Sequence, residues 1–290
     1  MSTDARSAKP MRLRQTPWLG VLPFLLFCLA FEIVPILLLV KSSFADRRGA
    51  WTLANYQAMS APLYARSFWN SIKLSAITAI LGVVLGLLIG YAIYHLPSQR
   101  LREALMALSD VTTNFAGAPL AFAFVVVLGS SGVVTLALQR YAHLKLYPRF
   151  SIYSYSGLIL AYLYFQLPLM VLLIIPAFAG LRRQWWESAQ CLGASSWDYW
   201  RRIGIPVLTP SLIAGLVLLF ANAFGAYATA YTLTGSSLTL ATIQIAFTIT
   251  GEVLHDPGLG SAMATISLLI MGLCMVIYQW ASARARRWTK

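Results

Sequence analysis

The amino-acid sequence predicts an all-α integral membrane protein with about six transmembrane helices. Its 290 residues are 59% hydrophobic and only 11% charged, and the mean hydropathy is +0.69. A soluble chain of this length could not bury so much apolar surface, so its solvent is lipid. Backbone groups in lipid are satisfied within helices or closed barrels, and apolar runs of about twenty residues favour helices over short alternating strands.

Six apolar segments are long enough to span a bilayer. In chain order they cover about 18–40, 70–94, 105–128, 156–180, 208–234 and 259–281. Several of them contain proline, which membrane helices tolerate better than soluble ones. The third segment is the weakest, because polar residues from Asp110 to Asn114 interrupt its first half. Together the segments predict one membrane domain, 18–281, between two short tails.

The lysines and arginines predict which side of the membrane each loop faces. Of the 22 basic residues, four each lie in the tail 1–17, the loop 181–207 and the tail 282–290, and two lie in the loop 95–104. The outer loop 235–258 has none. Because positively charged loops stay inside, both termini and the 181–207 loop are predicted to be cytoplasmic. The net charge of +13 then reflects topology and anionic lipid headgroups, and no nucleic-acid partner is needed.

Residues that carry chemistry are few and scattered, which argues against a membrane-embedded enzyme. Cys28, Cys191 and Cys274 form neither a disulfide framework nor a metal site, and the three histidines lie far apart along the chain. The phosphate-binding pattern Gly-x-x-x-x-Gly-Lys-Ser/Thr does not occur. We therefore expect no catalytic residue, no metal and no cofactor in this chain, so any energy for its work comes from another protein.

The 181–207 loop, between the fourth and fifth spans, carries the most specific signal. Residues 184–192 favour a short helix, and Gly193 lies where such a helix would stop with a positive φ. The segment Ser195–Asp198 is typical of a cap for a second short helix, which we expect to run to about Ile203. The prolines that follow would open the fifth span. These signals predict a helix–turn–helix along the membrane surface.

The spacing within this loop resembles the EAA loop of permease subunits of binding-protein-dependent ABC importers. That family's pattern is Glu-Ala-Ala, three residues, Gly, nine residues, Ile, any residue, Leu and Pro. The matching positions are Glu187, Ala189, Gly193, Ile203 and Pro206. Two positions differ mildly, since serine replaces the second motif residue and isoleucine replaces the leucine.

The resemblance implies that the loop is a coupling helix that fits a groove on a cytoplasmic ATPase subunit. The residues expected at that contact are Glu187, Ala189, Gly193, Ala194, Ser195, Ile203 and Pro206. The resemblance places the chain in the bacterial inner membrane, beside a second permease subunit that is similar or identical. The other implied partners are two ATPase subunits, which bind the ATP, and a periplasmic binding protein, which delivers substrate. Without the resemblance, the loop could be an interfacial segment that only connects two spans.

Polar residues within the spans predict the substrate path, because such residues are costly in lipid. The candidates are Asn114, Asn222, Tyr227, Tyr231 and Glu32. Small residues beside them more often serve helix packing, and Glu32 either contacts a cation or pairs with a basic group such as Lys73. Within the ABC permeases, segment 222–231 is similar to the branch that groups polyamine, ferric-ion, thiamine and aminoethylphosphonate importers. This favours a small charged solute, with a polyamine-like cation ahead of an anion.

The alternative function is a stand-alone secondary carrier or channel. Such a protein would predict an internal repeat, with broken helices and charged residues at the middle of the membrane. The two halves of this sequence show no clear similarity, and its most specific feature lies in a loop.

Overall fold

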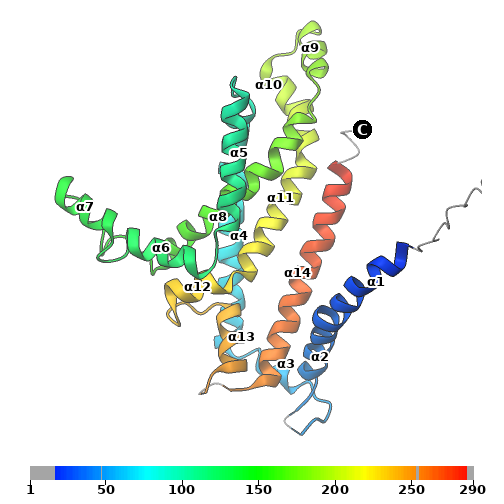
Figure 1. Cartoon of the computed structure of the whole chain (residues 1–290), viewed down its shortest axis with the longest axis vertical. Coiled ribbons are helices and arrows are strands. Elements are labelled where there is room, and N and C mark those ends of the chain that lie inside the picture. The colour runs from blue at the N-terminus through cyan, green and yellow to red at the C-terminus, as the bar shows by residue number, and fades with distance from the viewer. Residues whose placement is uncertain (1–16, 47, 253–254, 286–290) are drawn as a thin grey trace, which may run out of the picture.

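The computed structural model describes residues 17–46, 48–252 and 255–285, and the regular structure in these ranges is helical (Figure 1). The β-type pairing within them is an isolated bridge between Ala45 and Trp51. Most of the two predicted tails, 1–17 and 282–290, falls outside the described residues.

Six helical runs among the described residues are long and apolar enough to cross a bilayer, which confirms the predicted fold class. They cover Val21–Ser43, Pro62–Tyr94, Ala118–Tyr141, Tyr155–Ala179, Ser196–Gly225 and Pro257–Ala285. The second, fourth and sixth are the single helices α4 (Pro62–Tyr94), α8 (Tyr155–Ala179) and α14 (Pro257–Ala285). The predictions for these three spans agree with the helices to within a few residues, apart from the first turns of α4.

The first span consists of α1 (Pro17–Cys28), a π turn, η1 (Leu29–Ile33), and α2 (Val34–Ser43). The π turn ends two residues before Pro35, whose ring would clash with a carbonyl of the preceding turn in a regular helix. A widened turn relieves that clash. α2 packs against α14, whereas α1 slants away from the other helices (Figure 1). The predicted segment 18–40 lies within this run.

The prediction for the third span, 105–128, is wrong. The chain forms α5 (Gln99–Asn114), breaks, and then forms α6 (Ala118–Leu128) and α7 (Val133–Tyr141). Gly117 at the break has a φ of +77°, which a residue with a side chain rarely adopts. α5 packs along α8, while α6 and α7 extend sideways from the bundle as an arm (Figure 1). The polar residues that weakened this segment therefore lie on a helix of their own.

The prediction for the fifth span, 208–234, joins two helices that the structure separates. α11 (Ile205–Gly225) ends before Ala226, and α12 (Tyr227–Thr234) follows as a short helix. At its other end the helical run continues back to Ser196, although the apolar, membrane-spanning part is α11.

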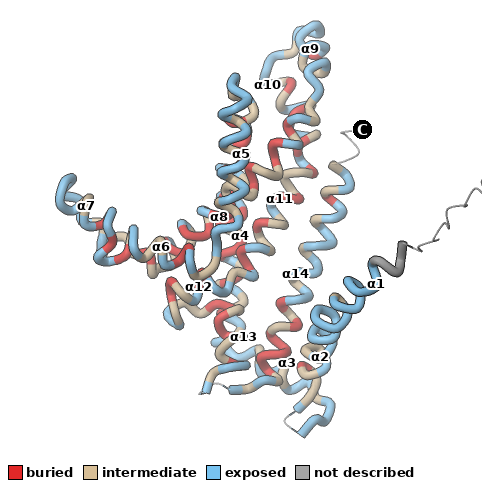
Figure 2. Tube along the Cα trace, viewed as in Figure 1, coloured by how far each residue is buried: buried red, intermediate tan, exposed pale blue. Residues whose placement is uncertain are grey.

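The core lies where α4, α8 and α11 pack together. Figure 2 shows buried residues along these helices and mostly exposed residues on α1. Glycine lets α4 approach α8 closely, since a Cβ atom at Gly86 would lie 2.6 Å from the Met170 side chain. The fully buried Gln166 amide on α8 donates to the Thr78 hydroxyl at 3.2 Å and to the Leu219 carbonyl at 3.4 Å. One side chain thus links all three helices.

Two short helices at the end of the bundle opposite the 181–207 loop were not predicted. They are α3 (Ala54–Ala58) and α13 (Ala241–Thr250). The Asn55 amide donates to two carbonyls at the end of the first span, at 2.9 and 3.0 Å, which holds α3 in place. The Ala241 N–H donates to the Ser71 hydroxyl at 2.8 Å, so α13 begins against α4. This end of the bundle is therefore closely tied to the membrane helices.

Candidate functional site

The 181–207 loop begins with α9 (Arg183–Cys191), within a residue of the predicted helix at each end. A Schellman motif ends the helix: the Gly193 N–H donates to the Gln190 carbonyl at 2.9 Å, and the Ala194 N–H donates to the Ala189 carbonyl at 3.0 Å. Gly193 has a φ of +75°, as predicted, and a Cβ atom there would meet nothing within 4 Å. Glycine is therefore favoured by backbone conformation and not by lack of space.

A capping box begins the second helix, as the sequence predicted. The Ser195 hydroxyl accepts a hydrogen bond from the Asp198 N–H at 3.2 Å, and the Asp198 carboxylate accepts one from the Ser195 N–H at 3.3 Å. Hydrogen bonds from the Ser195 hydroxyl and N–H, followed by the nearby Arg202 charge, lower the pKa of the Asp198 carboxyl. The carboxylate is thereby kept ionised at the start of the helix, where a negative charge is favourable.

The second helix does not stop near Ile203, which corrects the prediction of a separate short helix. α10 (Ser196–Tyr199) passes through a π turn, η2 (Trp200–Gly204), directly into α11. This π turn also ends two residues before a proline, Pro206, as the π turn in the first span does. The loop is therefore a direct extension of the fifth span.

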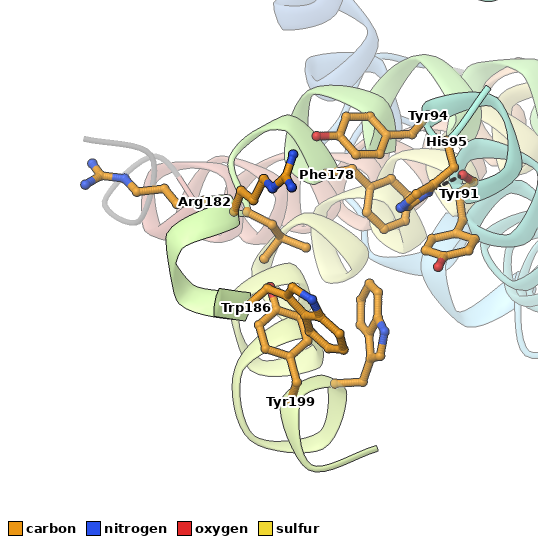
Figure 3. Close-up of a pocket in the computed structure, with 10 residues that line it drawn as sticks. Tyr91, Tyr94, His95, Phe178, Arg182, Trp186 and Tyr199 are labelled. Carbon is orange, nitrogen blue, oxygen red and sulfur yellow. Dashed lines mark hydrogen bonds between the residues drawn. The ribbon is translucent and has the colours of Figure 1, made fainter. Parts of the chain in front are cut away.

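Aromatic rings fasten the loop to the ends of two membrane helices. Trp186 on α9 meets Tyr199 on α10 edge to face, with 4.9 Å between ring centroids. Trp200 in η2 lies 5.8 Å from Tyr91 on α4, and Tyr91 lies 5.8 Å from Phe178 on α8. Figure 3 shows Tyr91 and Phe178 on one side of a hollow, with Trp186 and Tyr199 on the other. These contacts join the loop to the core.

The residues that match the motif differ in exposure. Glu187, Gly193 and Pro206 are exposed, whereas Ala189 is buried between the loop helices. The exposed Glu187 carboxylate accepts a hydrogen bond from the Arg183 Nε at 3.0 Å, one turn back on the same helix. The loop thus exposes the charged side chain of Glu187, which contributes little to the packing of the loop itself.

Four of the expected contact residues line one hollow of about 520 Å³ beside the turn. They are Ala189, Gly193, Ala194 and Ile203. Leu192 was not singled out from the sequence, and an apolar residue directly before a motif glycine is the signal that could have identified it. Two large apolar side chains are exposed here, since Leu192 is 88% exposed and Trp197 is 70% exposed. Their exposure in water is unfavourable, which fits a surface that a partner covers.

The helix breaks in the third and fifth predicted spans are bonded to each other. The buried Thr229 hydroxyl on α12 accepts a hydrogen bond from the Gly117 N–H at 3.0 Å and donates to the Gly117 carbonyl at 3.3 Å. The Tyr162 hydroxyl on α8 donates to the Ala226 carbonyl at 2.8 Å. The Thr229 hydroxyl thereby satisfies the Gly117 N–H, which the break leaves without a helical partner, as the membrane interior requires.

The structure brings together only part of the predicted substrate path. Tyr227 and Tyr231 on α12 stack with 5.4 Å between ring centroids, and both are exposed. Asn222 is exposed three residues before the α11–α12 break, and Asn114 is exposed at the end of α5, where its amide donates to the Asp110 carbonyl at 2.9 Å. The polar candidates of α5, α11 and α12 thus lie next to the two helix breaks.

Glu32 lies apart from that group, on the π turn of the first span. It is exposed, and no ion pair joins it to Lys73 or to another basic residue in the described ranges. Pairing with Lys73, one of the alternatives drawn from the sequence, is therefore not seen among the described residues, where the first span packs on the bundle mainly through α2. Contact with a cation stays a prediction.

Comparisons with known proteins agree with this geometry. The sequence profile of the family described as "Binding-protein-dependent transport system inner membrane component" matches residues 82–288. The spermidine/putrescine transport system permease protein PotB of Haemophilus influenzae is 28% identical over 268 residues, which are 89% of this chain and 91% of that protein. A probable sulfate transport system permease protein, cysT of Nephroselmis olivacea, is 25% identical over 290 residues, 99% of this chain and 97% of that one.

The fold also matches solved transporters. A bacterial ABC transporter involved in import of the acidic polysaccharide alginate has a TM-score of 0.70 at 19% identity, over 94% of this chain and 96% of the other. The MetNI methionine ABC transporter, in an inward-facing conformation, gives 0.54 at 16% identity, over 80% of this chain and 100% of that chain. The chain therefore belongs to the family of binding-protein-dependent transport system inner membrane components, as a multi-pass inner-membrane permease of the ABC importers and not an enzyme.

Proposed function

We propose that partner ATPases dock on the 181–207 loop of this chain, and that the loop transmits their conformational change to the membrane helices. The main support is the structure of the loop, which exposes Glu187, Leu192 and Trp197 while its aromatic rings contact α4 and, through Tyr91, α8. In this proposal the loop and both termini face the cytoplasm, as the basic residues predict. ATP binds to the partner subunits, and a periplasmic binding protein delivers substrate at the opposite end.

A second permease subunit, similar or identical, completes the pathway in this proposal. The support is the arm formed by α6 and α7, which leaves the bundle and exposes large apolar side chains. They include Phe122, Val126, Val133 and Leu136. Lipid alone could cover them, but an arm that projects sideways from its own bundle gains packing contacts from a neighbouring subunit.

For the cargo we propose a small charged solute, with a polyamine-like cation first. The stacked rings of Tyr227 and Tyr231 offer exposed π faces to an ammonium group, and the permeases of spermidine and putrescine systems are among the relatives. A sulfate-like anion is the second candidate. α6, α11 and α12 contain no carboxylate, and α6 and α12 begin at the two breaks, where helix N-termini carry partial positive charge.

Reconstitution tests the proposal directly. The chain would be placed in proteoliposomes with its cognate ATPase, partner permease and binding protein, and uptake of radiolabelled spermidine and sulfate would be measured with and without ATP. We expect uptake of one of them to require ATP and the binding protein. Uptake driven by an ion gradient, with this chain alone, would instead support a secondary carrier.

A further inference from the structure

A hollow of about 530 Å³ lies between the 181–207 loop and the ends of two membrane helices (Figure 3). Its floor and walls are aromatic, with Tyr91, Phe178 and Trp186 among the lining residues. The ring contacts described above join several of these lining residues to one another. The coupling role proposed above uses Glu187, Leu192 and Trp197, and none of these three lines the hollow.

The rim of the hollow is basic. Arg182 and Arg183, both exposed, line it together with His95. The Glu187 carboxylate on α9 accepts a hydrogen bond from Arg183 and offsets part of the charge at the rim. α9 begins at Arg183, and its first N–H groups add to the positive field at this point.

The hollow lies at the ends of two candidate membrane spans, where we expect the bilayer surface. α4 ends at Tyr94 and α8 ends at Ala179, so the apolar spans stop where the hollow begins. Aromatic residues concentrate at this depth in membrane proteins, and basic residues there attract anionic headgroups. The space is larger than a free phosphate needs and offers aromatic surface that inorganic phosphate cannot use.

We propose that the hollow binds the headgroup of an anionic phospholipid, with its phosphate at Arg182 and Arg183 and its glycerol region against the aromatic wall. The lipid would fill the space between the loop and the helix ends, and so support the contact that joins them. The inference requires a membrane-spanning chain but not the coupling role proposed above, so each can fail without the other.

Native mass spectrometry of the purified full-length chain tests the proposal without partner subunits. The chain in detergent would receive equal amounts of phosphatidylglycerol and phosphatidylcholine, and the retained lipid would be counted. We expect preferential retention of phosphatidylglycerol, reduced about thirtyfold in the double variant Arg182→Gln with Arg183→Gln, because each of the two basic residues contributes about 1 kcal/mol to such attraction. Lysine at both positions should preserve most of the retention, since it keeps the charge that attracts the headgroup.

The matched control is the double variant Arg201→Gln with Arg202→Gln. It removes the same charge from the same loop, but neither residue lines the hollow. Equal losses in both double variants, or equal retention of the two lipids by the unmodified chain, would overturn the proposal. Displacement of the lipid by millimolar inorganic phosphate would overturn the lipid as the ligand and assign the site to a soluble anion. Circular dichroism and size-exclusion profiles of each variant would show whether a loss of lipid reflects a loss of fold.

Discussion

The rings of Trp186 and Tyr199 meet edge to face, with 90° between their planes, and close the 181–207 loop into one unit. Trp186 comes from the helix before the Gly193 turn and Tyr199 from the helix after it. Such a pair contributes about 1 kcal/mol beyond its buried area, and Tyr199 is almost fully buried. The pair therefore links the two helices, and the contact of Trp200 with Tyr91 connects this unit to α4.

The first prediction concerns the charge of Glu187. Its bond to Arg183 is exposed and contributes only about 0.5 kcal/mol, so losing it should leave the fold intact. We expect Glu187→Lys to assemble poorly with the ATPase and to lose most of the ATP hydrolysis that the binding protein stimulates. Pull-down and stimulated hydrolysis in proteoliposomes measure the two effects.

Arg183→Gln is the control for that variant. It breaks the same ion pair but leaves the carboxylate free for a partner. We expect near-normal stimulation from it. If both variants behave like the unmodified protein, Glu187 has no part in docking.

The second prediction separates conformation from volume at Gly193. A side chain would meet no atom there, but the φ of +75° costs most residues about 1 kcal/mol or more. Asparagine tolerates this conformation better than alanine does. We therefore expect Gly193→Ala to weaken stimulated hydrolysis, Gly193→Asn to weaken it less, and Gly193→Pro to abolish it. An effect that follows side-chain size, with asparagine worse than alanine, would indicate a steric contact with the partner instead.

The loop could be predicted from sequence because its signals are local. The glycine turn and the Ser195 cap depend on residues within five positions of each other, and both occur in the structure as expected. The helix breaks depend on distant contacts. Thr229 meets Gly117 across 112 positions, and no periodicity within either span reveals that pairing. Polar residues before Gly117 indicated a weak point in the third predicted span. The apolar residues on either side nevertheless led us to predict one continuous helix.

Broken helices also show the limit of one sequence argument. We associated them with a secondary carrier, yet they occur here in the fold of the ABC permeases. The reason is physical and not specific to a transporter class: an unwound segment is tolerated wherever neighbouring side chains satisfy its backbone groups.

The third prediction tests orientation through a native cysteine. Cys191 is exposed in the loop, whereas Cys28 and Cys274 are half-buried within spans. A membrane-impermeant maleimide added from outside should leave Cys191 unlabelled, and labelling from the cytoplasmic side should fall when the ATPase binds. Cys191→Ser is the control, because any label that it takes up comes from other cysteines. Ready labelling from the periplasmic side would reverse the proposed topology.

The fourth prediction concerns the link between the helix breaks. Thr229→Val keeps the shape of the side chain but leaves the Gly117 N–H without its partner, at a cost of about 1–3 kcal/mol. We expect a lower melting temperature and slower transport, with ATPase assembly unchanged. Thr229→Ser restores the hydroxyl and should recover most of both. If valine is as good as serine, the bond is dispensable.

The fifth prediction concerns the tyrosine pair beside the breaks. Asn222→Leu and Tyr227→Ala should each lower transport several-fold while leaving ATPase assembly intact, because both residues are exposed and their loss removes little packing. Wild-type transport by both variants would mean that these residues only pack the helices.

Tyr227→Phe then distinguishes the two cargo candidates. A cation is attracted by the ring face, which phenylalanine retains, so polyamine transport should stay within about twofold of normal. An anion needs hydrogen-bond donors, and phenylalanine removes the hydroxyl, so sulfate transport should fall nearly as far as in Tyr227→Ala. The stacked Tyr231 ring keeps its position in the phenylalanine variant, since a 17° stack does not depend on the hydroxyl. Uptake of spermidine and of sulfate is therefore measured for the unmodified chain, Tyr227→Phe and Tyr227→Ala. The comparison shows whether the cargo is a cation or an anion.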